Sequence, residues 1–301
     1  MNIGQLRSRR INTLCLLLGY SRQAFYQQKR AIETEKLQYE LIIQQVLIIR
    51  ESQKNVGTRK LFVMLQAFLC QHSITIGRDA LFALLADNGL LIRKRRRNIP
   101  RTTYSDHWLR KYPNLIEKLT LNSANSLWVS DITYVTIASG FAYLSLITDA
   151  YSRKIVGYYL SKDLAAEGCV IALKMALNTL PSDSNLIHHS DRGCQYCSME
   201  YVEQLVDRNI AISMTQKADP RENAIAERVN GILKIEFLDT KKCTFNEAKL
   251  QIDKAIFIYN NERVHTSIDW HTPNQAHEMT GPLKRHWKSY YAKNKKEVTM
   301  T

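Results

Sequence analysis

The chain of 301 residues lacks a long, uninterrupted apolar segment. Its most apolar run, residues 37–49, is interrupted by Gln and Glu and is shorter than the roughly 20 apolar residues that a transmembrane helix needs. The N-terminus is basic and contains a short apolar stretch, but no small-residue cleavage site of a signal peptide follows it. These absences predict a protein of the cytoplasm.

Common catalytic motifs are also missing. The sequence has no glycine-rich phosphate loop, no G-x-S-x-G and no H-E-x-x-H. It has no internal repeat and no low-complexity tract either. The enzyme classes that those motifs mark, such as serine hydrolases of the nucleophile-elbow type and zinc proteases, find no support in the sequence.

Cysteine is sparse, with six residues in no pattern that suggests a secreted disulfide scaffold. Cys15, Cys70 and Cys169 lie in apolar segments, and we expect them to be buried as small apolar side chains. Cys194 and Cys197 form a Cys-x-x-Cys pair, which raises the alternatives of a zinc site or a redox dithiol.

The zinc alternative lacks a second pair of ligands. Structural zinc sites usually combine two ligand pairs that are separated in sequence, and no other Cys or His pair has that spacing here. His188 and His189 alternate across a predicted strand, so at most one of them faces a given side.

Acidic residues are too few to balance the basic ones. The chain has 42 Lys and Arg against 28 Asp and Glu, a formal net charge of +14, and its isoelectric point is about 9.5. Six cations fall within residues 92–101, which favours a polyanionic partner over a basic surface kept only for solubility.

The pattern along the chain predicts five segments. Residues 1–55 form an N-terminal helical region, and residues 56–98 a helix-turn-helix segment in which Gly89 ends the second helix. A plain helical hairpin is the alternative for this second segment. Residues 99–122 are a basic linker, and a core of strands and helices (residues 123–282) and a basic tail (residues 283–301) complete the chain.

The core segment reads as β-β-β-α-β-α-β followed by helices. Its second strand is apolar on both faces, as in a central strand that is covered on both sides. The fold class is therefore α/β, a mixed five-stranded sheet with flanking helices, preceded by the all-α helix-turn-helix region.

Three carboxylates are candidates for chemistry. Asp131 lies within an apolar strand, where it is either a hydrogen-bonded buried residue or a metal ligand. Asp191 ends the fourth strand, and Gly193 allows a sharp turn there. Glu227 lies on a polar helix stripe with two amides and a lysine, a stripe that could also be a solvated face.

A fourth carboxylate, Asp149, is predicted to be a turn residue. If residues 136–140 close a hairpin, Asp131 pairs near Ser145 and Leu127 pairs near Asp149. Asp149 then lies about four residues, or roughly 13 Å, from Asp131 along the strands. Three carboxylates on two strands and a helix suit Mg²⁺, which prefers oxygen ligands and, as a pair of ions, promotes in-line phosphoryl displacement.

These residues resemble a known family. Asp131 in "WVSDITYV", Asp191 in "HSDRGCQY" and Glu227 in "NAIAERVNGILK" are similar to the Asp-Asp-Glu triad of the DDE transposase and retroviral integrase superfamily, with 35 residues between the last two. The segment "GTRKLFVML…ITIGRDALFALLADNGLL" and the C-terminal "YNNERVHTSIDWHTPNQA" resemble the OrfB-type transposases of the insertion-sequence-three group.

The resemblance implies an RNase H-like core that requires Mg²⁺ or Mn²⁺, with two ions when DNA is bound. It implies cleavage of double-stranded DNA at element ends to free a 3′-OH, and attack of that 3′-OH on a second phosphodiester. It further implies a homo-oligomer on paired terminal repeats and an upstream-frame (OrfA-type) partner. A DNA-binding regulator of transposition without catalysis is the alternative function.

The resemblance also suggests residues that contact DNA. Lys234 is similar to a lysine that contacts element DNA near the active site, and Asn223 is expected to orient Glu227 or a phosphate. Residues of the loop after Asp191 are candidates for lining the DNA channel, and the basic cluster is expected to bind phosphates. These residues are Arg192, Gln195 and Tyr196 in the loop, and Arg93, Lys94, Arg95, Arg96 and Arg97 in the cluster. Tyr259, Asn260, Arg263 and His265 are expected to fix the C-terminal helix against the core.

Overall fold

A computed structural model describes residues 11–92, 108–117, 119–181, 184–216, 222–284 and 286. The chain divides into two compact units, one of residues 1–51 and 57–92 and the other of residues 52–56 and 93–301. Over the described ranges no helix is long and apolar enough to cross a membrane. The basic cluster at residues 93–97 lies outside these ranges, so its predicted contacts with phosphates stay a prediction.

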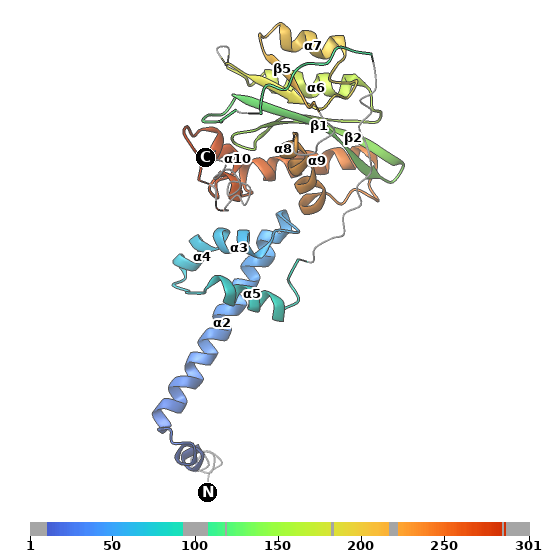
Figure 1. Ribbon diagram of the computed structural model, residues 1–301. Coiled ribbons are helices and arrows are strands. Elements are labelled where there is room, and N and C mark those ends of the chain that lie inside the picture. Colours follow the sequence, from blue (N-terminus) through green and yellow to red (C-terminus); the bar gives the residue numbers. More distant parts are fainter. Residues whose placement is uncertain are drawn as a thin grey trace, which may run out of the picture. The chain divides into compact units, whose positions relative to one another are not determined.

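The N-terminal unit is helical, as the sequence predicts (Figure 1). After the long helix α2 it contains three short helices with a turn before the last one. Gly89 follows α5 with φ of 66°, a left-handed conformation that favours glycine and ends the helix as expected. The helices are α2 (Arg22–Ser52), α3 (Thr58–Met64), α4 (Gln66–Gln71) and α5 (Arg78–Asp87).

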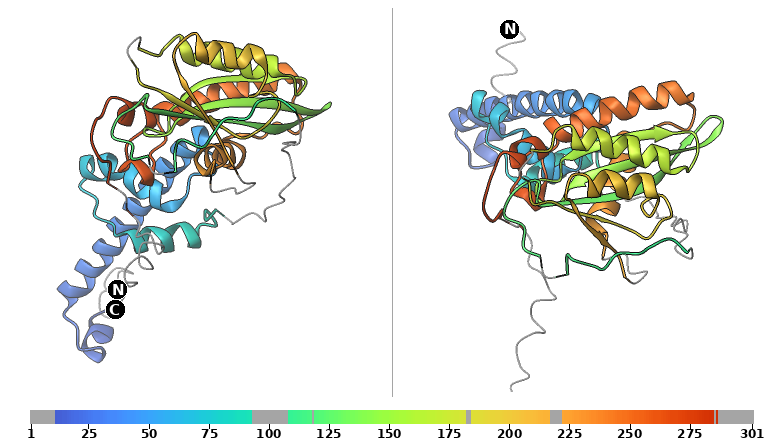
Figure 2. Two further views of the ribbon diagram at one scale, coloured as in Figure 1. Left: turned by 45° about the horizontal axis from the view of Figure 1, so that its top comes forward. Right: turned by 90° about the horizontal axis from the view of Figure 1, so that it is seen from above.

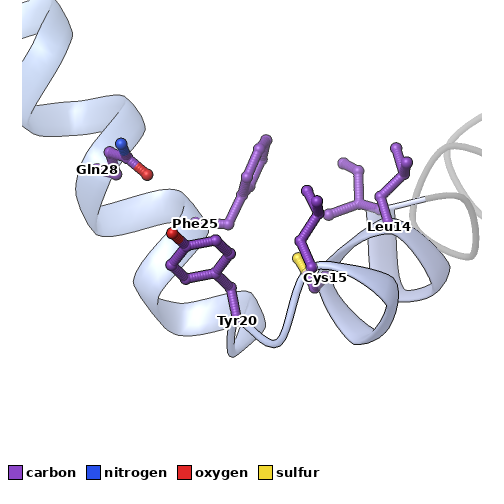
Figure 3. Close-up of a pocket in the computed structure, with 7 residues that line it drawn as sticks. Leu14, Cys15, Tyr20, Phe25 and Gln28 are labelled. Atoms are coloured by element: carbon purple, nitrogen blue, oxygen red, sulfur yellow. The ribbon is translucent and has the colours of Figure 1, made fainter.

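The start of this unit holds an apolar pocket of about 270 Å³ (Figure 3). Leu14 and Cys15 line it from the first described helical residues, and Phe25 and Gln28 line it from α2. Cys15 is buried as predicted, but Cys70 is exposed on α4, so the prediction of a buried Cys70 was wrong. An apolar neighbourhood in sequence does not decide which face of an amphipathic helix a residue occupies.

The second unit is built on a five-stranded sheet in the order β3-β2-β1-β4-β5. The first three strands are antiparallel, whereas β4 and β5 run parallel to β1. This is the predicted mixed sheet with its RNase H-like order of elements. The strands are β1 (Leu127–Ile137), β2 (Gly140–Asp149), β3 (Ile155–Ser161), β4 (Ile187–Ser190) and β5 (Ala211–Met214).

The first hairpin differs from the expected register by one residue. Asp131 pairs with Leu146 and Trp128 pairs with Asp149, because only residues 138 and 139 form the loop. Gly140, with φ of 125°, already belongs to β2 and pairs with Ile137. A two-residue loop sets the register of a hairpin, and a glycine in the left-handed region makes such a turn possible.

Helices cover both faces of this sheet, as Figure 1 and the two views of Figure 2 show. On one face the core contains Trp128, Ile147 and side chains of α6 (Ala166–Leu177) and α7 (Met199–Val206). On the other face Leu144 and Leu146 lie in a core with side chains of α8 and α9. The bounds of the latter helices are Ala224–Ile232 for α8 and Phe245–Asn261 for α9.

Two close contacts define the edges of this fold. Gly157 on β3 lies so close to α6 that a Cβ there would come within 2.2 Å of the Ala172 carbonyl oxygen, so only glycine fits. At the other edge, Met214 of β5 donates its N–H to the Pro113 carbonyl, and the Leu115 N–H donates to Ser213 Oγ. Part of the predicted basic linker therefore packs on the sheet and covers the edge strand.

The C-terminal part of the described chain returns to the start of the core. A π-helix, η1 (Leu233–Phe237), directly continues α8, and a 3₁₀ helix, η2 (Thr266–Ile268), and α10 (Pro273–His277) follow α9. Ser123 and Thr280 form an isolated antiparallel bridge.

Candidate active site

Asp131 and Asp191 lie side by side because of the strand register. Strands β1 and β4 are parallel neighbours, and Val129 pairs with His189 two residues before each aspartate. Asp131 continues β1, and Asp191 is the first residue after β4. The two carboxylates therefore emerge together where the short strand β4 ends, the edge at which parallel sheets commonly carry their functional groups.

Helix α8 carries Glu227 in its first turn, and two asparagines of α8 and its N-cap hold the helix to β1. Asn223, at the N-cap position, donates its side-chain N–H to the Ser130 carbonyl at 2.9 Å, and its own carbonyl accepts the Glu227 N–H at 3.2 Å. Asn230 donates its side-chain N–H to Asp131 Oδ2 at 2.7 Å. Glu227 lies between these two attachments, so α8 presents it toward the aspartates.

The charges of the three carboxylates act on one another. Burial, the charge of the neighbouring Asp191 carboxylate and, less strongly, that of Glu227 together raise the pKa of Asp131 to about 7. The hydrogen bonds from Asn230 and from the Ile132 N–H, which donates to Oδ1 at 3.0 Å, oppose this rise in pKa. The crowding of like charges is the electrostatic signature of a site that attracts cations.

Asp191 is held by the turn that follows it. The Gly193 N–H donates to Asp191 Oδ1 at 3.0 Å, and a Cβ at Gly193 would approach that oxygen to 3.1 Å. Glycine at this position therefore allows the backbone to approach the carboxylate closely, in addition to the turn that the sequence predicts.

The donor set of the site fits a hard divalent cation. In the part of the chain that the structure describes, no group of three His, Cys, Asp or Glu side chains is arranged to hold a metal ion. Carboxylate oxygens are nevertheless the ligands that Mg²⁺ and Mn²⁺ prefer. A cation would also relieve the repulsion that raises the pKa of Asp131.

Lys234 also lies near the carboxylates. It is half-buried in η1, where burial lowers the pKa of its ammonium group and the charge of Asp131 raises it. The helical spacing from Glu227 to Lys234 thus brings the lysine to the same side of the site. Arg192, which follows Asp191, is half-buried as well.

Tyr196 and Gln195, in the loop after Asp191, both contact other parts of the protein. Tyr196 is only 3% exposed and packs against both His188 and Tyr201, so the expectation that it lines a DNA channel was wrong. Its apolar ring is removed from water against the α7 side of the sheet. Gln195 donates its side-chain N–H to the Leu164 carbonyl at 2.9 Å, which ties its loop to the segment before α6.

The histidines before Asp191 are buried and neutral. His188 Nε2 hydrogen-bonds with Ser130 Oγ and the Tyr201 hydroxyl, and His189 Nδ1 hydrogen-bonds with Ser213 Oγ. Burial lowers the pKa of His188 to about 3 and that of His189 to about 4. These hydrogen bonds hold β4 to β1, α7 and β5.

The Cys-x-x-Cys pair offers no second site in the described ranges. Cys194 is exposed and Cys197 is buried, and both are free thiols. Burial raises the pKa of Cys197 to about 11, which disfavours the thiolate that metal binding and disulfide exchange require. The zinc and redox alternatives therefore find no support here.

Asp149 is the last residue of β2 and not a turn residue as predicted, but its carboxylate holds the turn that follows. Its Oδ1 accepts the N–H and the hydroxyl of Ser152, each at 2.7 Å, and its Oδ2 accepts the Asn125 N–H at 2.7 Å. Oδ1 thus holds the β2–β3 connection, and Oδ2 holds the segment before β1.

Sequence reasoning missed two interactions of residues that it had noticed. Asn230 was recognised only as an amide on the polar stripe of Glu227, and its bond to Asp131 depends on how α8 docks on β1. Glu236 lies where helical spacing predicts an apolar side, yet it forms a largely buried ion pair with Arg263 there. Arg263 and Tyr259 do fix the C-terminal helix to the core, as expected, and Asn260 exchanges two hydrogen bonds with the Ile155 backbone.

Comparison with known proteins identifies the family. The integrase core domain family matches residues 122–220, and a second integrase core domain family matches residues 208–273. An uncharacterized 31 kDa protein of insertion element IS600 from Shigella sonnei is 31% identical over 264 residues, which cover 85% of this chain and 94% of that protein.

Transposase InsF of insertion sequence IS3A from Escherichia coli (strain K12) is 30% identical over 231 residues, covering 75% of this chain and 78% of InsF. Among solved structures, the HTLV-2 integrase catalytic core domain in complex with magnesium is 22% identical, with a TM-score of 0.43 and coverage of 52% of this chain and 98% of that one. By the curated relatives and the domain matches, the chain belongs to the DDE transposase and integrase superfamily, in the IS3 group of insertion-sequence transposases.

Proposed function

We propose that this transposase cleaves and joins DNA with Asp131, Asp191 and Glu227 as its catalytic carboxylates. The observation that carries the proposal is the convergence of Asp131 within β1, Asp191 directly after β4 and Glu227 of α8, where burial and the charges of Asp191 and Glu227 raise the pKa of Asp131. The three carboxylates would hold Mg²⁺ or Mn²⁺, which, when bound, activates an attacking hydroxyl and stabilises the leaving oxygen in phosphoryl transfer.

Two reactions would follow in order at this site. In the first, water attacks the phosphodiester at the element end, the bond from phosphorus to the 3′-oxygen breaks, and a 3′-OH is released. In the second, this 3′-OH attacks a phosphodiester of target DNA, and one new bond replaces one broken bond. Both steps are in-line displacements at phosphorus, so one set of carboxylates serves both.

The chain's own residues prepare the site for these reactions. The amide of Asn230 and the Ile132 N–H orient the Asp131 carboxylate and favour its ionised form. Asn223 fixes the start of α8, and Lys234 is placed to bind a DNA phosphate beside Asp131. Arg192 is a further candidate for contact with the DNA backbone, and double-stranded element ends bound by a homo-oligomer are the proposed substrate.

The test is a cleavage and strand-transfer assay with duplexes of the element ends and Mn²⁺ or Mg²⁺. The upstream-frame protein should be included, because it is a proposed partner. We expect activity in the wild type and none above background in Asp191→Asn or Glu227→Gln. Asp207→Asn and Glu200→Gln on the exposed side of α7 make the same chemical changes away from the site and should keep wild-type activity. Full activity in both site variants would refute the assignment, and metal-independent DNA binding without cleavage would favour a regulator.

The pH dependence should change when Asn230 is replaced. In Asn230→Ala, Asp131 loses the hydrogen bond that lowers its pKa, so its pKa should rise further above about 7. Because the proposed active form is ionised at Asp131, activity should be lost at higher pH than in the wild type as the pH falls. Single-turnover cleavage rates from pH 6 to 9 measure this shift. If the cleavage rate fell at the same pH in Asn230→Ala as in the wild type, Asn230 would not control the pKa of Asp131.

A further inference from the structure

A π-helical turn lies directly behind the proposed active site. Helix α8 ends at Ile232 and continues without a break as η1, which contains Lys234 and Glu236. Two residues separated by one position point to nearly opposite sides of a helix. Lys234 faces Asp131, and Glu236 faces the loop after α9. Single π-helical turns are rare and often occur at functional sites.

Glu236 forms a buried, two-pronged ion pair with Arg263. Arg263 Nε donates to Glu236 Oε2 at 2.8 Å, and Nη2 donates to Oε1 at 2.9 Å. The Arg263 side chain is 2% exposed and the Glu236 side chain is 15% exposed. Such a planar pairing fixes direction as well as distance, which a lysine at position 263 would not do.

Arg263 is itself held in place from two other sides. Its Nη1 donates to His265 Nε2 at 2.7 Å, and its guanidinium lies over the Tyr259 ring at 5.8 Å from the centroid. Tyr259 is buried, and its hydroxyl donates to the Arg153 carbonyl at 3.0 Å. The guanidinium is thus an immobile anchor point on the α9 side of the sheet.

Stability alone does not explain this arrangement. Removing two charges from water costs about as much as their attraction returns, and apolar residues of similar volume often serve as well. What the pair adds is a fixed position for η1. If η1 relaxed to regular α-helix, Lys234 would rotate about the helix axis relative to Asp131.

We propose that the Glu236–Arg263 pair is a positioning device that holds the π-helical turn so that Lys234 faces the carboxylates and binds a DNA phosphate there. This inference rests on the proposed function, because it takes Lys234 as a DNA contact. It assigns a role at the active site to Arg263, which touches neither the carboxylates nor Lys234.

The test is the salt dependence of DNA binding by the full chain, measured in EDTA so that catalysis plays no part. Each lost phosphate contact reduces the slope of log affinity against log salt by about 0.9. We expect Lys234→Ala to lose about one contact, and Arg263→Lys and Glu236→Gln to lose the same contact. The double variant Lys234→Ala/Arg263→Lys should lose no more than Lys234→Ala alone.

Two measurements separate positioning from folding. Circular dichroism and thermal unfolding identify variants that remain folded, and acetylation of Lys234, read by mass spectrometry, should be faster in folded Arg263→Lys or Glu236→Gln than in the wild type. Glu200→Gln, which disrupts the exposed pair of Lys174 and Glu200 in the same unit, is the matched control and should change neither readout.

Three results would each overturn the proposal. They are additive losses of slope in the double variant, a wild-type slope in both folded Arg263→Lys and Glu236→Gln, and no effect of Lys234→Ala on the slope. The carboxylate assignment fails by a different result, namely undiminished cleavage in Asp191→Asn and Glu227→Gln. The two proposals can therefore fail separately.

Discussion

Asp131→Asn is expected to abolish DNA cleavage and, at the same time, to stabilise the fold. Loss of a ligand charge should lower the cleavage rate by about 1,000-fold, the rate equivalent of roughly 4 kcal/mol. The same substitution removes a carboxylate whose pKa is raised to about 7 by burial and by the charges of Asp191 and Glu227. Asparagine keeps the shape and can still accept the hydrogen bond from Asn230.

The size of the gain in stability depends on pH. An acid with a raised pKa binds its proton more tightly in the folded state, so stability falls as the pH rises from about 3.9, the unfolded value, to about 7. The difference between the two pKa values corresponds to a free energy of unfolding of roughly 4 kcal/mol. Because Asp131 is partly in contact with solvent, we expect Asp131→Asn to gain only about 2 kcal/mol in stability. The gain in Asp131→Asn should therefore be largest at pH 8 and small near pH 4.

Urea unfolding followed by tryptophan fluorescence measures this gain. All four tryptophans lie between residues 108 and 287, so their signal reports on the α/β unit. In EDTA the variant should be more stable than the wild type, and added Mg²⁺ should stabilise the wild type more than the variant. Asp207→Asn is the control. A loss of stability at pH 8 would show that Asp131 is a structural residue instead of a crowded carboxylate.

Local sequence patterns were sufficient to predict the sheet and the three carboxylates. Asp131 and Asp191 are recognisable because each interrupts or ends an apolar strand, and parallel pairing of those strands brings them together. Helical periodicity places Glu227 and Lys234 on one face. Such patterns depend only on neighbours within a few positions, which is why one sequence suffices to find them.

Other features depend on how elements dock and could not be read in this way. Tyr196 lies in a polar loop sequence, yet its ring turns inward and packs against His188 and Tyr201. Glu236 reads as an acid on an apolar helix side until Arg263, 27 positions later, is seen to meet it. The register of β1 and β2 changes by one residue with the length of their loop, which composition does not specify.

Arg263→Met is expected to cause the largest loss of stability. The substitution breaks the largely buried ion pair of Glu236 and Arg263, and breaking such a pair by removing one partner typically costs about 3–5 kcal/mol. It should therefore shift the urea midpoint of the tryptophan signal to lower concentration. Lys174→Met, in an exposed ion pair with an N–O separation of 3.9 Å, is the comparison and should cost less than about 1 kcal/mol.

A second substitution separates stability from positioning. In Arg263→Met/Glu236→Leu no buried charge remains, so most of the lost stability should return, since apolar replacements of buried ion pairs are often neutral. The apolar pair cannot reproduce the directional contact that holds η1, so its DNA binding should keep the reduced salt slope of Lys234→Ala. A double variant with both normal stability and a wild-type slope would mean that packing alone positions Lys234. A stable variant with the reduced slope would establish that the charges of Arg263 and Glu236 serve the active site.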